Sequence, residues 1–488
     1  MVSIAHCQDI EVLRQIALLQ EQELRTMQDR IQGLARRLAQ LEGKDATAAQ
    51  VELEFLKELL AQRTQALFGD SSEKRPRTPP SGEPKPPRRG HGPRAQLSLP
   101  VIEVVHDLPE GERTCPECGG VLSEMAGQFE ESEEITVVER EFKLVKHQRR
   151  KYRCRCNACV VTAPGPLKLQ PGGRYSVEFA VEVAVAKYLD HLPLERQRRM
   201  MAREGLTIDS QTLWDQIDVL GSHLELTYEA LRHRLLAKDL VHADETWWRL
   251  MGKDTTRWWV WTLASEDTIV HRVLPSRSQE AARAVLEGYT GTVMADGYGV
   301  YTALARAGPT FTLVHCWAHV RRKVLEAEAH YPEEARQALE WIGKLYGVER
   351  EAGADAALRH ALRRDRSQRI LDELKGWAHE QRALPQSSLG KAIHYMLELW
   401  PGLTVFVNDP RIPLDNNAAE RGLRGVVLGR KNHYGSRSER GTQVAALFYS
   451  LLETAKLCVV DPKDYLLRAA RQAIADPETV LLPIPAAD

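Results

Sequence analysis

The chain has 488 residues, of which 43% are hydrophobic and 27% charged, so it can bury the cores of more than one domain. Its 66 basic and 67 acidic residues nearly cancel, and net charge therefore does not indicate a nucleic-acid partner. No apolar run approaches the roughly 20 residues of a membrane helix, and charge appears too early for a secretory signal. We expect a cytoplasmic protein without membrane contact, whose eight cysteines are reduced thiols or metal ligands.

The N-terminal segment carries the pattern of a coiled coil. Apolar side chains in 10–41 follow alternating steps of three and four residues, with Gln20 as the polar interruption, and a second phase begins after Gly43. This spacing predicts a coiled-coil helix within 1–68. Two interpretations stay open: the helix packs on its own protein, or it associates with a second copy or a partner helix. Self-association would make the protein a homo-oligomer.

A change of composition marks 69–100 as a basic flexible linker. The segment is rich in Pro, Gly and Ser and has too few large apolar side chains to bury a core. Between 71 and 94 it holds seven Lys or Arg against two Glu. Such a tether could follow a phosphate backbone, or it could be a solvated spacer only.

A cysteine-rich segment follows at 101–165 and holds five of the eight cysteines. Paired cysteines separated by strand-like segments are typical of a zinc ribbon, in which four thiolates surround a structural Zn²⁺ and leave no open coordination position. The predicted ligands are Cys115, Cys118, Cys156 and Cys159, with Cys154 as an alternative in the second pair. Seven Lys or Arg and no acid between 142 and 155 predict a basic face toward DNA.

Residues 166–238 are predicted to be helical and resemble a helix-turn-helix. One helix ends before Gly205, and the next is capped at 209 or 210. An ordinary helical hairpin gives the same pattern, so DNA contact here is one of two interpretations. The candidate contacts, in the helix before the turn, include Arg196 and Arg199.

The region 239–440 has the order of elements of a ribonuclease-H-like α/β core. Three strand-like runs with short connections are followed by helix, strand, helix and strand. The first three strands can form an antiparallel meander, and helical crossovers then add parallel strands. A helical insertion at about 321–400 interrupts the core, and 441–488 is a C-terminal helical region. The predicted fold class is therefore multidomain α+β.

Three carboxylates in this region are candidates for a catalytic metal site. Asp244 ends the first strand-like run and Asp296 the fourth, where an acid needs a partner or a cation. Glu420 lies one turn into a later predicted helix; Asp415 competes with it, but a helix cap explains Asp415 sufficiently. Carboxylate oxygens suit Mg²⁺ or Mn²⁺, and two such ions activate the nucleophile and stabilise the leaving oxygen in phosphodiester cleavage.

Several longer motifs give the chain a recognisable family resemblance. In chain order they are LFGDSSEKR (67–75), CPECGG (115–120), KYRCRC…CVVTAP (151–164), ADETWW (243–248), ADGYGVY (295–301), HCWAHVRRK (315–323), LDNNAAERGLRGVVLGRKNHYGS (414–436) and SLLETAKLCVVDP (450–462). With these motifs the chain resembles the large transposase of the IS66 family of bacterial insertion sequences. The resemblance implies a DDE transposase that cuts the ends of its element and joins them to target DNA.

The resemblance also implies roles for residues and partners. It places the catalytic role on Asp244, Asp296 and Glu420, and it implies two small accessory proteins encoded by the same element. A bacterial, nucleoid-associated protein is expected. The basic residues of ERGLRG and GRKN resemble DNA-backbone contacts, namely Arg421, Arg424, Arg430 and Lys431. Two alternatives are a non-catalytic DNA-binding protein derived from a transposase and a nuclease of the same fold.

A histidine pair and a group of tryptophans have more than one interpretation. His315 and His319 are four residues apart at a helix start, a spacing that can bind metal, but we favour packing and hydrogen bonding around the site. The functional alternative is contact with the scissile phosphate or with a flipped base. Most of the tryptophans between 247 and 261 are expected in the core, with Trp248 as the one that could face DNA.

Overall fold

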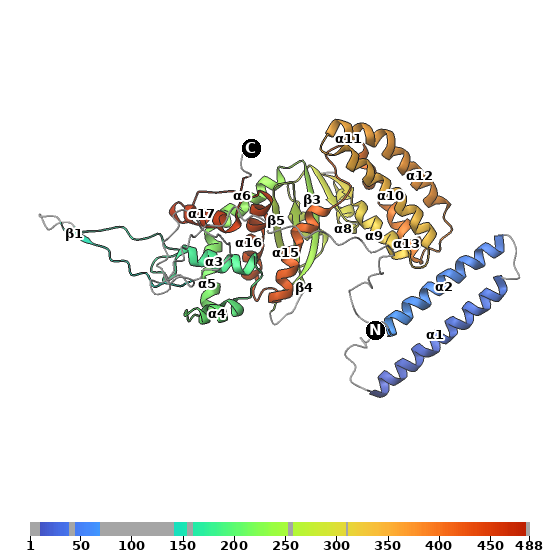
Figure 1. Cartoon of the computed structure of the whole chain (residues 1–488), viewed down its shortest axis with the longest axis horizontal. Coiled ribbons are helices and arrows are strands. Elements are labelled where there is room, and N and C mark those ends of the chain that lie inside the picture. Colours follow the sequence, from blue (N-terminus) through green and yellow to red (C-terminus); the bar gives the residue numbers. More distant parts are fainter. Residues whose placement is uncertain are drawn as a thin grey trace, which may run out of the picture. The chain divides into compact units, whose positions relative to one another are not determined.

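The computed structural model describes residues 10–38, 44–68, 141–153, 160–251, 257–308 and 311–484 (Figure 1). The predicted linker at 69–100 and all five cysteines between 115 and 159 lie outside these ranges. A short antiparallel pair of strands, β1 (Lys151–Arg153) and β2 (Val160–Thr162), flanks the second cysteine group. In the described part of the chain, no helix has the length and apolarity needed to cross a membrane.

The N-terminal segment forms a helical hairpin of α1 (Ile10–Leu38) and α2 (Lys44–Phe68). Ion pairs join Arg30 to Glu52 at 2.7 Å and Arg63 to Glu23 at 3.0 Å, so the two helices run antiparallel. Within 19–38, the half-buried positions of α1 are those of the predicted seam, and the others are exposed. The seam is therefore covered by the same chain, and a homo-oligomer stays a prediction.

A five-stranded sheet occupies the centre of the fold, with strand order β5-β4-β3-β6-β7. The strands β3 (Leu240–Arg249), β4 (Arg257–Ala264) and β5 (Ile269–Leu274) form an antiparallel meander. Two further strands, β6 (Thr292–Ala295) and β7 (Thr312–His315), run parallel to β3. The crossovers contain α7 (Gln279–Val285) and α8 (Gly299–Ala307). This is the order of elements expected from the sequence.

Four helices lie between β2 and the central sheet: α3 (Val177–Tyr188), α4 (Leu194–Arg203), α5 (Ser210–His223) and α6 (Glu225–Leu236). The turn between α4 and α5 contains Gly205 with φ +86°, which favours glycine, and Asp209 caps α5 by accepting a hydrogen bond from Thr212 N at 2.6 Å. These features confirm the predicted break and cap.

The C-terminal region consists of α15 (Asn417–His433), α16 (Glu439–Leu457) and α17 (Pro462–Ala475). Residues 444–455 of α16 are all buried, because the helix lies against β5 on one side and against α3, α5 and α17 on others. Its Ser450 and Thr454 hydroxyls accept hydrogen bonds from the β5 amides of His271 and Ile269 at 2.8 and 3.0 Å. These bonds cover the outer edge of the sheet, which would otherwise be open to pairing with another strand.

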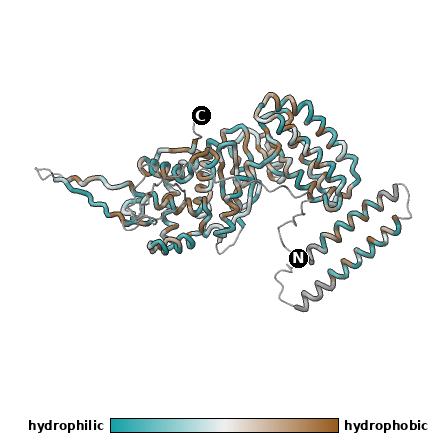
Figure 2. Tube along the Cα trace, in the orientation of Figure 1, coloured by the Kyte–Doolittle hydropathy of each residue, from teal (hydrophilic) through white to brown (hydrophobic). Residues whose placement is uncertain are grey.

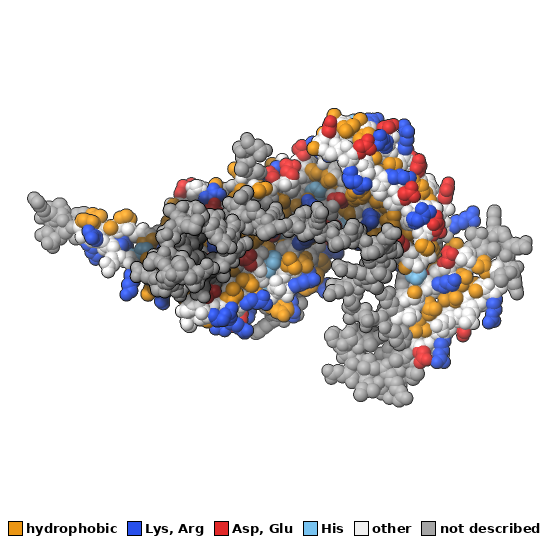
Figure 3. All heavy atoms as spheres, in the orientation of Figure 1, with side chains coloured by type: hydrophobic (Ala, Val, Ile, Leu, Met, Phe, Trp, Pro, Cys, Tyr) orange, Lys and Arg blue, Asp and Glu red, His pale blue; other side chains and the backbone are white. Residues whose placement is uncertain are grey.

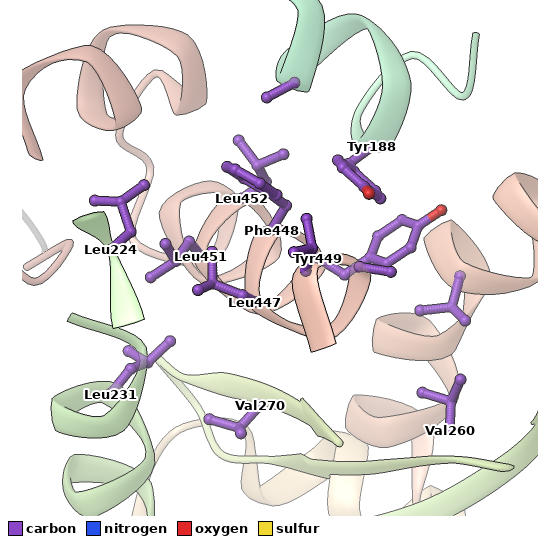
Figure 4. Packing of buried hydrophobic residues seen from close by; sticks show 14 of the residues in the cluster. Tyr188, Leu224, Leu231, Val260, Val270, Leu447, Phe448, Tyr449, Leu451 and Leu452 are labelled. Atoms are coloured by element: carbon purple, nitrogen blue, oxygen red, sulfur yellow. The ribbon is translucent and has the colours of Figure 1, made fainter. Parts of the chain in front are cut away.

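One hydrophobic core joins the sheet to the helices on both sides of it in the sequence. Tyr188 of α3 stacks on Phe448 of α16 with ring centroids 5.2 Å apart, and Val260 and Val270 of the sheet belong to the same cluster (Figure 4). The predicted boundaries at 238/239 and 440/441 therefore do not interrupt the core. Residues 166–238 and 441–475 pack as part of the same unit as the sheet.

A second core lies in the helical insertion. The helices that supply this core are α9 (Trp317–Ala327), α10 (Pro332–Ala352), α12 (Gln368–Glu380), α13 (Ser388–Glu398), α14 (Trp400–Thr404) and η4 (Val405–Val407). The insertion also contains α11 (Ala356–Leu362) and η3 (Arg363–Ser367). Along these helices hydrophobic and hydrophilic residues alternate, as expected for amphipathic helices that bury one face (Figure 2). The insertion thus forms between β7 and α15, where the sequence predicted it.

Candidate active site

The two aspartates lie side by side: Asp244 is in the middle of β3, not at its end as predicted, and Asp296 directly follows β6. The parallel pairing of β3 with β6 reaches His242 and Met294, and extending this register by two residues places Asp244 beside Asp296. Neighbouring strands are separated by about 4.8 Å, so the backbone segments that carry the two carboxylates run next to each other. The register of β3 and β6 therefore brings together residues that are far apart in the sequence.

Asp244 is partly buried and has three acidic neighbours. Burial raises the pKa of the Asp244 carboxyl to about 7, and the nearby charges of Glu245, Asp296 and Glu420 contribute. A hydrogen bond from the backbone amide of Glu245 to Asp244 Oδ1, at 2.8 Å, opposes this rise only in part. The effect of Glu420 on this pKa places the third carboxylate within electrostatic reach of the first.

Glu420 lies in the first turn of α15 and faces the start of α9. Its Oε1 is 3.7 Å from His319 Nε2 and 3.8 Å from an Arg322 guanidinium nitrogen. The competing acid, Asp415, accepts a hydrogen bond from the backbone amide of Asn417 at 3.2 Å. That bond gives Asp415 a structural role at the start of α15, and it leaves Glu420 as the acid of this segment that acts on Asp244.

The carboxylates suit a hard divalent cation by charge and donor type. In the ranges that the structure describes, no three His, Cys, Asp or Glu side chains already meet at one metal-binding point. Carboxylate oxygens are nevertheless the ligands that Mg²⁺ and Mn²⁺ prefer. A cation beside Asp244 would also relieve the repulsion that raises its pKa. On these two grounds Asp244, Asp296 and Glu420 fit such an ion.

The turn after β6 is held by hydrogen bonds from three elements. Asp296 Oδ1 accepts from Tyr298 N at 2.9 Å, and Gly297 N donates to the Tyr395 hydroxyl at 3.1 Å. His315 Nδ1 lies 3.2 Å from the backbone carbonyl oxygen of Asp296, to which it can only donate. His315 therefore supports the Asp296 backbone, whereas His319 faces Glu420.

A buried ion pair lies behind Asp244 on the opposite face of β3. The Glu245 carboxylate accepts hydrogen bonds from the Arg277 guanidinium, one of them at 2.8 Å, and from the Tyr301 hydroxyl at 2.8 Å. The guanidinium also lies 3.7 Å from the centre of the Tyr298 ring. These contacts join β3 to the helix that follows Asp296. The sequence analysis missed Glu245, although its place beside Asp244 was visible, and the sequence contains no local signal for Arg277.

The tryptophans of β3 are placed opposite to the expectation. Trp248 is 1% exposed, donates a hydrogen bond to Ser436 Oγ at 3.1 Å and packs against His433. The interpretation that Trp248 faces DNA is therefore wrong, because α15 and its following turn cover that face of β3. Trp247 is the exposed one, at 40%, and its ring lies 3.9 Å from the Arg430 guanidinium carbon.

An exposed stripe of basic residues runs along α15. Arg421, Arg424 and Lys431 are all exposed, and none forms an ion pair in the described ranges. Arg430 differs, because it is buried and its guanidinium donates to Thr246 Oγ1 at 3.0 Å and to the Trp247 carbonyl. A buried and hydrogen-bonded guanidinium cannot also follow a DNA backbone, so we assign Arg430 to the packing of α15 on β3.

The sequence that forms this site matches a known protein family. A family model described as "Transposase IS66 family" matches residues 172–444, which include β3, β6 and all of α15. The match covers more than half of the chain. The chain belongs to the IS66 transposase family.

Similar proteins of Sinorhizobium fredii agree with this membership. The proteins y4qI and y4jD, both described as uncharacterized, are 30% identical to the chain over 403 and 410 residues. The alignments cover 78% of this chain in both cases, with 74% of y4qI and 78% of y4jD. A solved structure, the Mos1 transposase paired-end complex with left transposon end, matches 49% of this chain and 80% of that chain at 13% identity and a TM-score of 0.12. A TM-score of 0.12 does not indicate a shared fold.

A second family model covers the cysteine-rich segment. It describes the zinc-finger binding domain of transposase IS66 and matches residues 112–157. The match contains Cys115, Cys118, Cys154 and Cys156 and ends before Cys159. The IS66 chain therefore has the family's zinc-finger domain, and the identity of its fourth ligand stays a prediction.

The predicted helix-turn-helix has an uneven charge distribution. Basic side chains gather over α4, which carries Arg196 and Arg199 (Figure 3). Arg199 pairs with Glu195 at 3.2 Å, and Arg196 is exposed. In contrast, α5, which would be the recognition helix, has no Lys or Arg. If this region of the IS66 chain contacts DNA, α4 offers the charge for it.

Proposed function

We propose that this chain is a DNA transposase that cleaves the ends of an insertion sequence and joins them to target DNA. The observation that supports the proposal is that Asp296 and Glu420, from two other segments of the chain, both lie within electrostatic reach of Asp244. The sheet order, three antiparallel strands followed by two parallel ones, supports a ribonuclease-H-like core. Membership of the IS66 transposase family supports the same activity.

In the proposed reaction the chain's own groups bind and orient DNA and metal. Asp244, Asp296 and Glu420 would hold Mg²⁺ or Mn²⁺, which supplies activation of the attacking oxygen and neutralises charge on the phosphate. Water attacks the phosphodiester at the element end, and the bond to the 3′ oxygen breaks to leave a 3′-hydroxyl. That hydroxyl then attacks a target phosphate and displaces another 3′ oxygen, so no covalent protein–DNA intermediate is needed.

The remaining parts of the chain have proposed roles around this reaction. A structural Zn²⁺ would be held by Cys115, Cys118, Cys156 and Cys159, with Cys154 as the alternative, in a domain that contacts the element ends. Self-association would bring two ends together, on a surface other than the covered α1 seam. Two small accessory proteins of the same element are further proposed partners.

The basic stripe of α15 begins beside Glu420 and would guide the DNA backbone into the site. Replacing Arg421, Arg424 or Lys431 by Gln is expected to weaken binding of all DNA sequences alike. Each change should reduce the slope of log affinity against log salt by about one, because one fewer counterion is released. Fluorescence anisotropy over a series of salt concentrations measures this slope. The matched control is Arg336→Gln, an exposed arginine of the insertion that is paired with Glu333 at 2.6 Å.

A triple variant combines Arg421→Gln, Arg424→Gln and Lys431→Gln. If its salt slope equals that of the wild type, DNA does not follow α15. An equal loss of slope in the Arg336 control would indicate a general charge effect. Only a loss confined to the stripe supports the proposed path.

The activity itself is tested with DNA carrying the ends of the element. Wild-type protein should cleave these ends with Mg²⁺ or Mn²⁺ and not with a chelator, and it should join pre-cleaved ends to a second DNA. Cleavage without joining would identify a nuclease of the same fold. Binding without cleavage or joining, with metal present, would identify a non-catalytic DNA-binding protein.

A further inference from the structure

Asn416 lies between the segments that carry the candidate carboxylates. It is fully buried, and its side-chain Nδ2 donates a hydrogen bond at 2.8 Å to the carbonyl of Ala243, the residue before Asp244. Its Oδ1 lies 3.0 Å from His242 Nδ1. Its backbone amide donates to Cys316 Sγ, at the junction of β7 and α9, at 3.1 Å. One residue thus touches β3 and the start of α9 at the point where α15 begins.

The orientation of the Asn416 amide follows from its partners. A backbone carbonyl can only accept, so the group facing Ala243 must be the NH₂ group. The side-chain oxygen then faces His242, whose Nδ1 must carry a proton to donate to it. The Asn416 amide donates one hydrogen bond to β3 and accepts one from it. Both bonds can form in only one position of the start of α15 along the strand.

These bonds are not those of an ordinary helix cap. Asn416 is the N-cap residue of α15, a position where Asn normally accepts a hydrogen bond from an amide in the first turn. Its side chain makes no such bond here. Instead it is used entirely on β3, while its backbone carbonyl accepts from Glu420 N at 3.2 Å. Helix capping alone does not account for the placement of this side chain.

A short covalent and hydrogen-bonded path therefore links two of the carboxylates. It runs from Asp244 through the carbonyl of Ala243 to Asn416 and on to the backbone of Glu420. We infer that Asn416 is a positioning residue that holds Glu420 at a set distance from Asp244, so that the pair can bind a divalent cation. This inference rests on the proposed function, because it needs the two acids to share a metal site.

The test compares Mn²⁺ binding by four variants of the full-length protein with the wild type. Asn416→Ala removes both side-chain bonds, and Asn416→Asp keeps the size and the acceptor but loses the donor. Both are expected to weaken Mn²⁺ binding, measured by electron paramagnetic resonance of the free ion, by about 10–100-fold, the usual loss when a supporting contact behind a metal ligand is removed. Affinity for end DNA should change by less than about twofold, because the exposed stripe of α15 stays intact.

Ser450→Ala and Glu420→Gln are the controls. Ser450 is also buried and bonds to a strand amide, but at the outer edge of the sheet, so its loss lowers the unfolding temperature without changing Mn²⁺ affinity. If Asn416 variants that melt no lower than Ser450→Ala bind Mn²⁺ like the wild type, the inference is overturned. If Glu420→Gln weakens Mn²⁺ binding while both Asn416 variants do not, only the positioning role fails. If Glu420→Gln also binds like the wild type, the proposed metal site and this inference fail together.

Discussion

Asp244→Asn is expected to lower the rate of end cleavage by at least about 10³-fold, the scale of loss when a central catalytic group is removed. Asparagine has nearly the same size as aspartate but carries no charge and binds Mg²⁺ or Mn²⁺ weakly. The same change is expected to raise the unfolding temperature of the metal-free protein. Cleavage is measured in single-turnover reactions on end DNA, and unfolding by circular dichroism.

The opposite directions of these two effects follow from the pKa of Asp244. Burial, with the charges of Glu245, Asp296 and Glu420, raises the folded-state pKa from 3.8 to about 7. A raised carboxyl pKa means that the folded state binds the proton more tightly, so its stability falls as pH rises from about 4 to about 7. Above pH 7 the whole penalty is present, and asparagine removes it. Mn²⁺ should stabilise the wild type and have less effect on the variant.

Asp239→Asn is the matched control for this prediction. Asp239 lies just before β3, is exposed and pairs with Arg411 at 2.8 Å. Its replacement should change cleavage by less than about twofold, since exposed ion pairs contribute little. Asp296→Asn and Glu420→Gln should lose cleavage as Asp244→Asn does. Wild-type cleavage by all three variants, with intact DNA binding, would show that the carboxylate assignment is wrong.

Local patterns in the sequence predicted the order of the elements well. Asp296 directly follows β6, as predicted, and the cap at Asp209 begins α5. These features depend on residues that are near one another in the chain. Examples are an apolar run followed by an acid, and a side chain that accepts a hydrogen bond from the backbone amide three residues later. Asp296 could therefore be placed at a strand end before the sheet was known, whereas the full length of β3 depends on its pairing with β4. The prediction that Asp244 ends its strand is wrong, because β3 continues past it to Arg249 and stays paired with β4.

The sequence predicted less well which helix packs on which face of a strand or of another helix. Alternation along β3 indicates that Trp247 and Trp248 face opposite sides, but it does not say which side α15 covers. The helix α16 had a usable signal, because the run VAALFYSLLETA is apolar on all sides and such helices are buried. The seam of α1 predicted a partner helix without showing that α2 of the same chain supplies it.

The supporting contacts of the site were beyond sequence reasoning for a physical reason. Asn416 was recognisable as a possible helix start, but its side-chain partners are 173 and 174 residues away in the chain. Arg277 meets Glu245 across 32 residues that include the strands β4 and β5. Hydrogen bonds over such separations follow from the packed fold, whereas the three acids stand in local sequence motifs that could be recognised before the fold was known.

Replacing Arg363 by Met is expected to destabilise the helical insertion by about 3–5 kcal/mol, the usual cost of breaking a buried ion pair. Arg363 is 1% exposed, and its guanidinium binds the Glu349 carboxylate at 2.7 and 2.8 Å. It also donates to the carbonyls of Phe406, Asp409 and Ile412 at 2.7, 2.9 and 3.0 Å. Methionine fills similar space but leaves one carboxylate and three carbonyls without this donor.

The carbonyls that Arg363 binds belong to the segment that leads into α15, so its loss should affect the site as well as the insertion. The unfolding temperature should fall by roughly 6–20 °C, with cleavage reduced even where the protein stays folded. Arg336→Met is the matched control: its ion pair with Glu333 is exposed, and its loss should cost less than about 1 kcal/mol. Arg363→Lys keeps the charge but loses the planar fork of donors, so it should recover only part of the stability. A variant Arg363→Met that melts within about 2 °C of the wild type would show that the guanidinium does not hold this segment to the insertion.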